Sequence, residues 1–260
     1  MPDILSIDIG NSRLKLALLR GDEILFKTQE QTQRFKSAKF RREFCDSILQ
    51  EVKAREARAE KIALSAVVPD VARLLTNRIE RAFKKRVVSV SANLRLPFEL
   101  RYKTPNTLGA DRLALMAYAA KRFPNVAVIA IDFGTAITYD VLASERIYLG
   151  GLILSGFGAS LSALRRQTAQ LPEVALTSQT ELIGESTVEC LERGAYWGAI
   201  AQTESLIVRL KEHLKKTRGE KRVKIVATGG DAALVAERLK FDEIENDAVL
   251  KGAAYLAELN

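Results

Sequence analysis

The chain has 260 residues, of which 47% are hydrophobic, and a formal net charge of +8. Its length allows one large domain or two of about 130 residues, each with its own core. No apolar run approaches the roughly 20 residues of a membrane helix, which excludes a helical membrane protein. The first residues, Met1-Pro2-Asp3, lack the basic and apolar regions of a signal peptide, so we expect a cytoplasmic protein with no membrane partner.

The cysteines and the histidine do not form patterns that carry chemistry. Cys45 and Cys190 stand in helix-like stretches without metal or redox spacing, which predicts reduced, buried thiols. His213 is the only histidine in the sequence. We therefore expect it to be a surface side chain rather than a metal ligand or a member of a catalytic triad.

The excess of positive charge gathers in segments 34–42, 84–86 and 215–224. A basic surface can bind nucleic acid or an anionic small substrate, or it can be a solvated face. The clusters lack the interleaved aromatic residues that base stacking uses, apart from Phe35, Phe40 and Phe44, whose spacing suits a core stripe. The charge pattern therefore does not favour a nucleic-acid partner.

Apolar runs bounded by turn residues predict five strands and two helices in the first half. In chain order these are strands 3–8, 14–19 and 23–28, helix 34–57, strand 61–68, helix 70–85 and strand 86–91. The first helix has apolar residues at every fourth position from Phe40 to Val52, and the second follows Pro69, a favoured helix start. This order resembles the ribonuclease H-like unit of the actin, sugar-kinase and heat-shock ATPase superfamily.

The second half repeats this order with longer helices. The predicted elements are helix 110–122, strands 126–131, 137–143 and 146–153, helices 157–170 and 186–216, strand 223–228, and helices 231–239 and 247–258. We expect the helix 186–216 to be interrupted near Gly194 or Gly198. The fold class is therefore α/β, with two ribonuclease H-like domains at 1–112 and 113–260, each a mixed five-stranded sheet flanked by helices. The periodicity breaks most clearly at 102–109.

A short pattern of strand, turn and strand occurs twice, as IDIGNS at 7–12 and IDFGTA at 131–136. Glycine lets the backbone approach a phosphate closely, and successive turn N–H groups form a concave anion site. Two copies predict two similar half-domains that face each other across a nucleotide. A GxxxxGK[ST] motif does not occur, which excludes a P-loop.

The residues of the first turn suit the chemistry of phosphoryl transfer. Asp8, at the end of a buried strand, can hold Mg²⁺ through water, because Mg²⁺ takes one or two carboxylates plus phosphates. Asn11 and Ser12 add side-chain donors, and Lys15 can offset charge on the transferred group. The alternative is an ordinary hairpin with Gly-Asn in its turn.

The second turn and a later glycine pair extend the same site. Asp132 can take a cation, and Thr135 can bond a phosphate, with Thr138 close behind. The turn at 228–230 (TGG), which follows a predicted strand, would let adenosine lie close to the backbone. A plain strand-to-helix turn is the alternative for that segment.

Between the two copies, Gly109-Ala110-Asp111-Arg112 opens an apolar helix. A kinase that acts on an alcohol needs a carboxylate to accept the hydroxyl proton and a cation to hold an acidic substrate. Asp111 and Arg112 can serve these needs. Alternatively, Asp111 is simply favourable near a helix N-terminus and Arg112 is solvated.

The chain resembles the type III pantothenate kinases, bacterial enzymes that phosphorylate pantothenate with ATP in the first step of coenzyme A synthesis. The block GADR combined with D-x-GTA-x-T-x-D is specific to this family within the superfamily. The match runs nearly end to end and includes DIGNSRLKLALL (8–19), SAVVPD (65–70), YKTPNTLGADR (102–112), IDFGTAITYDVL (131–142), GGLILSG (150–156), STVECLERGAYWG (186–198) and ATGG (227–230).

The resemblance implies a role for each matching residue. It implies pantothenate and ATP as substrates, and Mg²⁺ and a monovalent cation (K⁺ or NH₄⁺) as cofactors. It also implies a homodimer, in which Thr187 reaches the pantothenate pocket across the dimer interface. The implied residues are Asp111 as general base; Asp8, Ile9, Gly10, Asn11, Ser12, Arg13, Leu14, Lys15 and Thr135 for ATP; Tyr102, Gly109, Ala110, Asp111, Arg112 and Thr187 for pantothenate; Asp132 for the monovalent cation; and Asp8 for Mg²⁺.

The chain departs from the family pattern at Ser12, where threonine is usual, and at Ser155, where proline usually precedes Gly156. The first change keeps the hydroxyl, and the second leaves the loop less rigid. Two rival functions stay open: a non-catalytic, transcription-linked accessory factor of the same fold family, and a kinase of another small hydroxy acid or sugar. A complete phosphoryl-transfer set argues against the first rival, because a binding protein does not need one.

Overall fold

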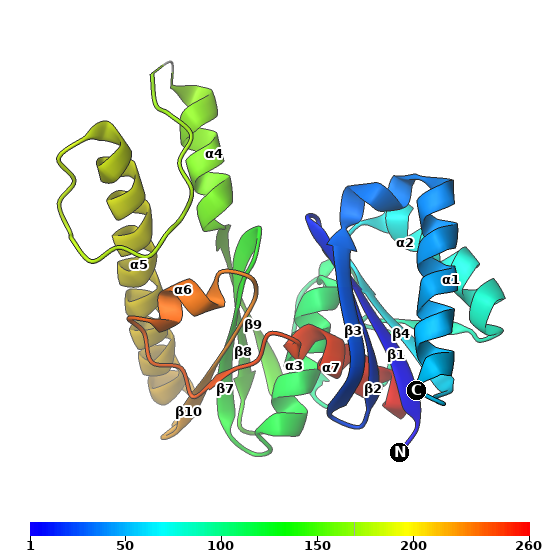
Figure 1. Ribbon diagram of the computed structural model, residues 1–260. Helices are drawn as coiled ribbons and strands as arrows, with labels where there is room; N and C mark the ends of the chain where they lie inside the picture. Colours follow the sequence, from blue (N-terminus) through cyan, green and yellow to red (C-terminus); the bar gives the residue numbers. More distant parts are fainter. Residues whose placement is uncertain (169) are drawn as a thin grey trace. The chain divides into compact units, whose positions relative to one another are not determined.

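The computed structural model describes residues 1–168 and 170–260 and has an α/β fold (Figure 1). The chain divides into two compact units. Unit 1 comprises Met1–Arg122 and Asp247–Asn260, and unit 2 comprises Phe123–Asn246. Across the described residues, none of the helices combines the length and the apolar character that crossing a membrane requires.

Unit 1 is built around a mixed sheet with strand order β3-β2-β1-β4-β5. The first three strands are antiparallel neighbours, whereas β4 and β5 run parallel to β1. The elements of unit 1 are β1 (Asp3–Ile9), β2 (Arg13–Arg20), β3 (Glu23–Gln31), η1 (Thr32–Lys36), α1 (Ala38–Ala54), β4 (Ala59–Ala66), α2 (Pro69–Phe83), β5 (Val87–Ser89), β6 (Glu99–Leu100), η2 (Pro105–Thr107), α3 (Ala110–Arg122) and α7 (Ala248–Leu259).

Alternation along β1 places its side chains on two packed faces. Leu5, Ile7 and Ile9 join a core formed with α1 and α2. On the other face, the Ser6 hydroxyl donates a hydrogen bond of 2.7 Å to the carbonyl oxygen of Leu250 in α7. Because α7 packs on β1, β4 and α3, the last helix of the chain completes the unit that the first strand begins.

Unit 2 repeats this topology. Five strands of its sheet follow the order β11-β10-β7-β8-β9, with β7, β8 and β9 antiparallel neighbours and β10 and β11 parallel to β7. Its core joins β7 residues to Tyr196 and Ala199 of the long helix α5. The elements are β7 (Ala127–Phe133), β8 (Ala136–Ala143), β9 (Ile147–Ser155), α4 (Phe157–Gln167), α5 (Thr187–Arg218), β10 (Val223–Thr228), α6 (Ala232–Ala236) and β11 (Glu243–Ile244). The predicted class, α/β with two mixed sheets flanked by helices, is confirmed.

Three helix predictions are wrong in their limits. The helix predicted at 34–57 starts at Ala38, because residues 32–36 form a 3₁₀ turn and the Ser37 hydroxyl caps α1 by accepting a hydrogen bond from the Phe40 N–H. The helix predicted at 231–239 is only the short α6. The helix predicted at 157–170 ends at Gln167, and its position 169 lies outside the described residues.

Helix α5 runs without the expected interruption for 32 residues. The cost of a glycine in a helix interior is about 1 kcal/mol, and packing offsets it easily. Tyr196, Ala199 and Thr203 are buried along the same stretch of α5. The positions where Cβ atoms of Gly194 and Gly198 would stand are open, so neither glycine marks a bend forced by a close contact.

The compact units meet at 122/123 and at 246/247, and the expected domain division at 112/113 stays a prediction. Helix α3 and helix α7 both belong to unit 1, because they pack on each other and on its sheet. A Cβ on Gly252 would stand 1.8 Å from the carbonyl oxygen of Ala114, so the two helix backbones approach very closely. Unit 1 is therefore discontinuous in sequence.

Predictions for single side chains have mixed outcomes. Phe35 and Phe44 are buried and form an edge-to-face pair, and the partly buried Phe40 packs against the same core, as the core stripe required. His213 is exposed. Cys45 is buried, whereas Cys190 is exposed, which corrects the expectation of two buried thiols. Cys190 lies in the first turn of α5, and its thiol donates a hydrogen bond to the carbonyl oxygen of Gly184.

Candidate active site

The first turn, between β1 and β2, is a fixed hairpin rather than a loose loop. The N–H of Gly10 donates to the carbonyl oxygen of Arg13 at 3.0 Å. The buried Thr32 closes the turn from behind: its hydroxyl donates to the Gly10 carbonyl at 2.7 Å, and its N–H donates to the Ser12 carbonyl at 3.0 Å. Asn11 and Ser12 stay exposed. The turn therefore presents polar groups to solvent from a rigid base.

Asp8 lies one residue before the end of β1, beside Ser65 of the parallel strand β4. The fully buried Ser65 donates its hydroxyl proton to Oδ1 of Asp8 at 2.9 Å. Burial raises the pKa of Asp8 to about 6; the Ser65 hydrogen bond opposes this change, the charge of Asp111 adds to it, and the charge of Lys15 opposes it. Burial and the neighbouring negative charge therefore both disfavour the ionised form of Asp8.

Asp111 occupies the first turn of α3, and its carboxylate folds back over the helix start. Its Oδ1 accepts a hydrogen bond of 2.8 Å from the N–H of Arg112. A Cβ on Gly109 would stand 2.4 Å from the same oxygen, so the glycine makes room for the carboxylate. Burial raises the pKa of Asp111, while the N–H and the charge of Arg112 oppose that change. A partly buried carboxyl with a raised pKa is suited to accept a proton.

Arg112 is only 6% exposed, so the alternative of a solvated arginine is wrong. Buried charges in proteins are paired or bind charged ligands, because an isolated one is costly. Its charge acts on Asp111, as the pKa of that carboxyl reflects. The GADR segment therefore brings together the carboxylate and the cation that its sequence predicted.

The other predicted residues of unit 1 divide into surface and core positions. Lys15 stands opposite Asp8 in the antiparallel register of β1 and β2. Ile9, Leu14 and Ala110 are buried, so their side chains belong to the core. Arg13 is exposed, and Tyr102 lies in the loop between β6 and η2 with partial exposure.

The residues of unit 1 fit a hydrated Mg²⁺ ion. Asp8 and Asp111 interact as like charges, and a divalent cation relieves such repulsion. Within the described residues, no group of three or more His, Cys, Asp or Glu side chains forms a ready-made metal cage. Mg²⁺ usually keeps several waters and binds one or two carboxylates together with substrate phosphates. The carboxylates of Asp8 and Asp111 therefore suffice for such an ion.

The second turn, between β7 and β8, has the same internal bond as the first. The Gly134 N–H donates to the carbonyl oxygen of Ala136 at 3.1 Å. Gly156, at the start of α4, packs against this turn: its N–H donates to the Thr135 carbonyl at 3.0 Å, and a Cβ there would stand 2.3 Å from the Gly134 oxygen. Thr135 itself is exposed. The repeat is therefore structural as well as sequential.

The glycine pair after β10 packs on the second turn. Gly229 has a φ of +97°, and a Cβ there would stand 2.4 Å from Oδ1 of Asp132 and 2.5 Å from the Phe133 carbonyl oxygen. The N–H of Asp231 donates to that same carbonyl at 3.1 Å. The segment therefore helps to fix the second turn, and its predicted place beside adenosine stays a prediction.

Oxygen atoms gather around Asp132. Thr138 stands opposite it in the register of β7 and β8, and the buried Thr138 hydroxyl has no hydrogen-bond partner among the described residues. The Asp132 carboxylate and the Thr138 hydroxyl are hard oxygen donors, which suit a cation of the alkali or alkaline-earth type.

Thr187 is the first residue of α5. Ser186 caps this helix by accepting a hydrogen bond of 3.3 Å from the N–H of Glu189, as a serine followed three residues later by glutamate predicts. Thr187 is exposed in the described structure.

Three contributors were missed from the sequence: Thr32, Ser65 and Gly156. Thr32 is distant from the turn it supports, and only the pairing of β2 with β3 brings it there. Ser65 gave a usable signal, since it lies near the end of a predicted strand, as Asp8 does. Gly156 is the last residue of the motif GGLILSG (150–156), but the sequence predicted no role for it.

A mixed-sheet unit that occurs twice, each copy with an Asp-x-Gly turn after its first strand, defines the class of the actin-like ATPases and sugar kinases. The chain belongs to the type III pantothenate kinase family, whose model matches residues 4–209.

Relatives in that family match over nearly the whole chain. A type III pantothenate kinase of Chlorobium luteolum is 37% identical over 258 residues, covering 99% of this chain and 94% of the relative. One of Legionella pneumophila (strain Corby) is 34% identical and covers 99% of each chain. Among solved structures, a protein from Campylobacter jejuni named as a Baf family transcriptional activator superposes with a TM-score of 0.54 at 19% identity, covering 98% of this chain and 97% of that one. This last likeness shows the fold alone.

Proposed function

We propose that this protein transfers the γ-phosphoryl group of ATP to the primary hydroxyl of pantothenate, the first step of coenzyme A biosynthesis. Membership in the family supports this activity. The observation that carries it is the GADR segment, where the Asp111 carboxylate with its raised pKa lies beside the buried Arg112. Pantothenate has both a hydroxyl to be deprotonated and a carboxylate to be held.

In the reaction, Asp111 accepts the proton of the pantothenate hydroxyl. The hydroxyl oxygen forms a bond to the γ-phosphorus while the bond to the β-phosphate oxygen breaks and ADP leaves. Arg112 provides the positive charge for the substrate carboxylate, and Tyr102 and the Gly109–Ala110 backbone line the pocket. Positioning and electrostatics supply most of the acceleration.

The first turn binds the phosphates of ATP. Its exposed N–H groups, the Asn11 and Ser12 side chains and Lys15 offer donors and positive charge. Asp8 would hold a Mg²⁺ ion through water, and the ion would supply positive charge to the phosphates. The Ser65 hydroxyl keeps the Asp8 carboxylate oriented and favours its ionised form.

Unit 2 carries the supporting half of the machinery. Asp132, helped by Thr138, holds a monovalent cation, and Thr135 contacts ATP. Thr187 contacts pantothenate from a second copy of the chain, which makes the enzyme a homodimer. The protein works in the cytoplasm, as an enzyme of coenzyme A biosynthesis does. Each unit carries one phosphate motif, the first turn in unit 1 and the second turn in unit 2.

The test is a coupled assay of ADP release with and without pantothenate, at matched ionic strength in K⁺ or Na⁺. We expect ADP release to require pantothenate and to rise with K⁺. Other small hydroxy acids and sugars serve as alternative acceptors. Turnover with one of these and none with pantothenate would replace the substrate assignment.

The accessory-factor alternative is less well supported. Its only structural support is the fold it shares with the Baf family protein, which is 19% identical. Asp8, Asp111 and Asp132 are each placed by close packing of glycine, serine or threonine. DNA binding in the absence of any ADP release would favour this alternative.

A further inference from the structure

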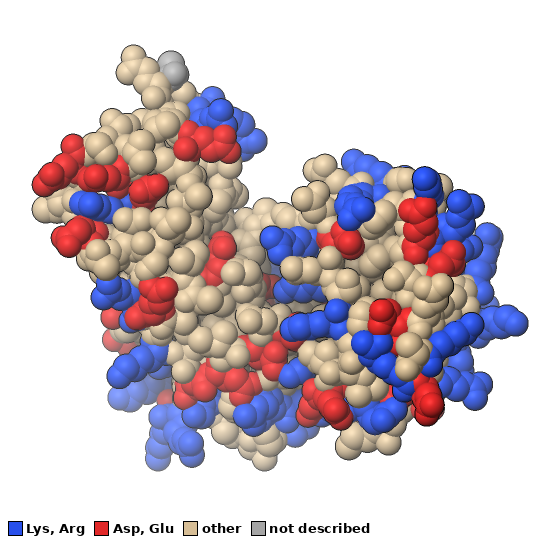
Figure 2. All heavy atoms as spheres, viewed as in Figure 1, with Lys and Arg blue, Asp and Glu red and all other residues tan. Residues whose placement is uncertain are grey.

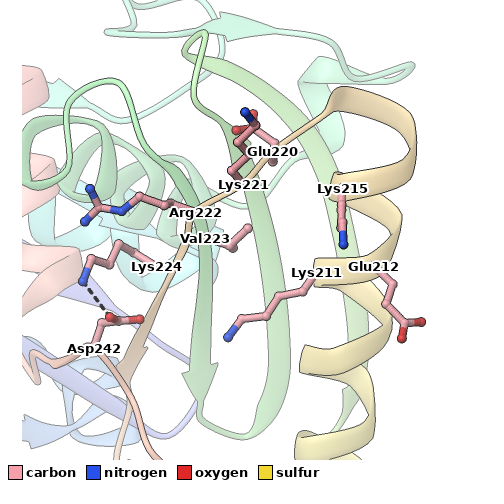
Figure 3. Close-up of a pocket in the computed structure, with 9 residues that line it drawn as sticks. All are labelled: Lys211, Glu212, Lys215, Glu220, Lys221, Arg222, Val223, Lys224 and Asp242. Atoms are coloured by element: carbon pink, nitrogen blue, oxygen red, sulfur yellow. Dashed lines mark hydrogen bonds and ion pairs between the residues drawn. The ribbon is translucent and has the colours of Figure 1, made fainter.

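A basic pocket in unit 2 takes no part in the proposed reaction. It has a volume of about 420 Å³ and lies where α5 ends and β10 begins (Figure 3). None of its lining residues belongs to the phosphate turns or to the GADR segment. Figure 2 shows Lys and Arg gathered at this end of unit 2, at the lower left.

Cations from three segments line this α5–β10 pocket: Lys211 and Lys215 from α5, Lys221 and Arg222 from the following loop, and Lys224 from β10. In Figure 3, Lys211 extends from α5 toward the strands, while Glu212 extends away on the other side of the helix. Glu212 therefore adds little negative charge inside the pocket, although it is one of the lining residues.

The other two acidic residues of the pocket are already engaged. Asp242 accepts hydrogen bonds from Lys224 at 2.7 Å and from the Ile225 N–H at 2.8 Å. Burial raises the pKa of Asp242, but these bonds and the charges of Lys224 and Lys211 together outweigh burial and lower the pKa. Glu220 accepts two bonds of 2.9 Å from the N–H and hydroxyl of Ser144. Little negative charge is left to balance the remaining cations.

Four cations of the pocket, Lys211, Lys215, Lys221 and Arg222, make no hydrogen bond or ion pair within the described residues. The end of a helix favours positive charge, which explains one or two of them but not a concave group of four. Like charges held close together repel one another, and a bound polyanion removes that repulsion. Lys and Arg are the side chains that proteins use to bind phosphate.

We propose that the α5–β10 pocket binds a small anion that carries two or more linked phosphate groups, at a site separate from the kinase reaction. The volume suits a di- or triphosphate moiety rather than a long polymer. No aromatic side chain lines the pocket, so it lacks the stacking platform of a single-stranded nucleic-acid site.

The test titrates the full chain with inorganic tripolyphosphate in Mg²⁺-free buffer by calorimetry. We expect a binding event that weakens about tenfold or more in Lys211→Gln/Lys215→Gln and in Lys221→Gln/Arg222→Gln, because each pair removes two charge-assisted contacts. Lys36→Gln/Lys39→Gln, which removes the same charge from an exposed segment of unit 1, leaves it within about twofold. Thermal unfolding confirms that all variants are folded.

Two of the variants separate this site from the kinase site: Lys15→Gln, which is added here, and Lys211→Gln/Lys215→Gln. Lys15→Gln alters the first phosphate turn and is expected to leave tripolyphosphate binding at the α5–β10 pocket unchanged. Lys211→Gln/Lys215→Gln is expected to leave pantothenate-dependent ADP release unchanged. Loss of tripolyphosphate binding only in Lys15→Gln would overturn the proposal, because the phosphate turn would then be the binding site. Equal weakening in all variants, or tight binding of a 20-nucleotide single-stranded RNA without tripolyphosphate binding, would overturn it too.

Discussion

Asp8 is a residue where stability and the proposed function oppose each other. Burial first, and then the charge of Asp111, raise its pKa from 3.8 to about 6 against the Ser65 hydrogen bond. A carboxyl whose folded-state pKa is raised stabilises the fold fully below its unfolded pKa. That stability is lost as the pH rises through the folded pKa. At neutral pH the folded protein therefore holds an unfavourable charge, which a bound cation would compensate.

Asp8→Asn is expected to stabilise the ligand-free protein at neutral pH. In the wild type, the titration of Asp8 removes about 1 to 1.5 kcal/mol of stability between pH 5 and pH 7.5. The variant lacks this loss, because an amide does not ionise. Urea unfolding at both pH values measures the difference. Asp70→Asn, at an exposed carboxylate, is the control; an unchanged pH dependence in Asp8→Asn would contradict the account.

Asp111→Asn is expected to lower kcat about 100-fold or more, because the amide cannot accept the hydroxyl proton. The protein stays folded, since the Asn carbonyl can still accept the Arg112 N–H. Steady-state ADP release and thermal unfolding measure the two effects. Asp70, which also lies in the first turn of a helix, supplies a matched control through Asp70→Asn. Near wild-type turnover in Asp111→Asn would remove the residue from its proposed role.

Candidate functional residues could be predicted to act together where they are adjacent in the sequence. Asp111 and Arg112 are adjacent, so their pairing needed no knowledge of the fold. Ser65 and Thr32 act on Asp8 and Gly10 through strand pairing, which fixes the neighbour only once the register is known. Burial of Arg112 likewise depends on packing around α3, which hydrophobic periodicity does not describe.

At the scale of elements, the second phosphate turn depends on two other junctions. Gly156, at the start of α4, and Gly229, after β10, both approach the β7–β8 turn more closely than a Cβ would allow. The turn is thus held by backbone contacts from two other segments of unit 2. A hairpin whose position is fixed in this way can keep Asp132 and Thr135 in place when a ligand binds.

Gly229→Ala is expected to destabilise the protein by about 2 kcal/mol or more. The added methyl meets Asp132 and Phe133 at under 3 Å, and the φ of +97° is strained for alanine. Activation by K⁺ falls as Asp132 is displaced. Gly230→Ala is the neighbouring control, because its Cβ position is open and its φ is not positive. Thermal unfolding and K⁺ titration of ADP release compare the two; equal effects would refute the packing argument.

Elements themselves were predictable in proportion to how local their signals are. Apolar runs located the long strands of both sheets within a few residues. The unbroken course of α5 was not predictable, because the burial of Tyr196 and Thr203 outweighs a local glycine. The start of α1 depended on Ser37 as a cap, a signal that charge-rich residues around it obscured.

At the scale of the whole molecule, the chain leaves unit 1 at Arg122 and returns at Asp247. The predicted boundary at 112/113 followed from a break in periodicity, which marks a loop but not the partners of the helix that follows. The partner of α3 is α7, more than a hundred residues later, and only tertiary packing reveals it.

Gly252→Ala is expected to loosen unit 1 selectively, because its methyl would collide with the backbone of α3. Hydrogen exchange should show lost protection in β1, β4 and α3, while β7 and β8 keep theirs. Gly198→Ala, in the open interior of α5, is the control and is expected to stabilise the protein by about 0.5–1 kcal/mol. Uniform loss of protection across both units would show that they unfold together instead.

The late return of α7 also sets an order of events during synthesis. Translation delivers β1 and the first phosphate turn at the outset, yet the helix that covers β1 and β4 is made last. Every segment of unit 2 has left the ribosome before α7 does, because domains emerge from the N-terminus onward. Unit 1 is therefore completed after unit 2, and α7 can cover its sheet face only after the 124 residues of unit 2 (Phe123–Asn246) have been translated.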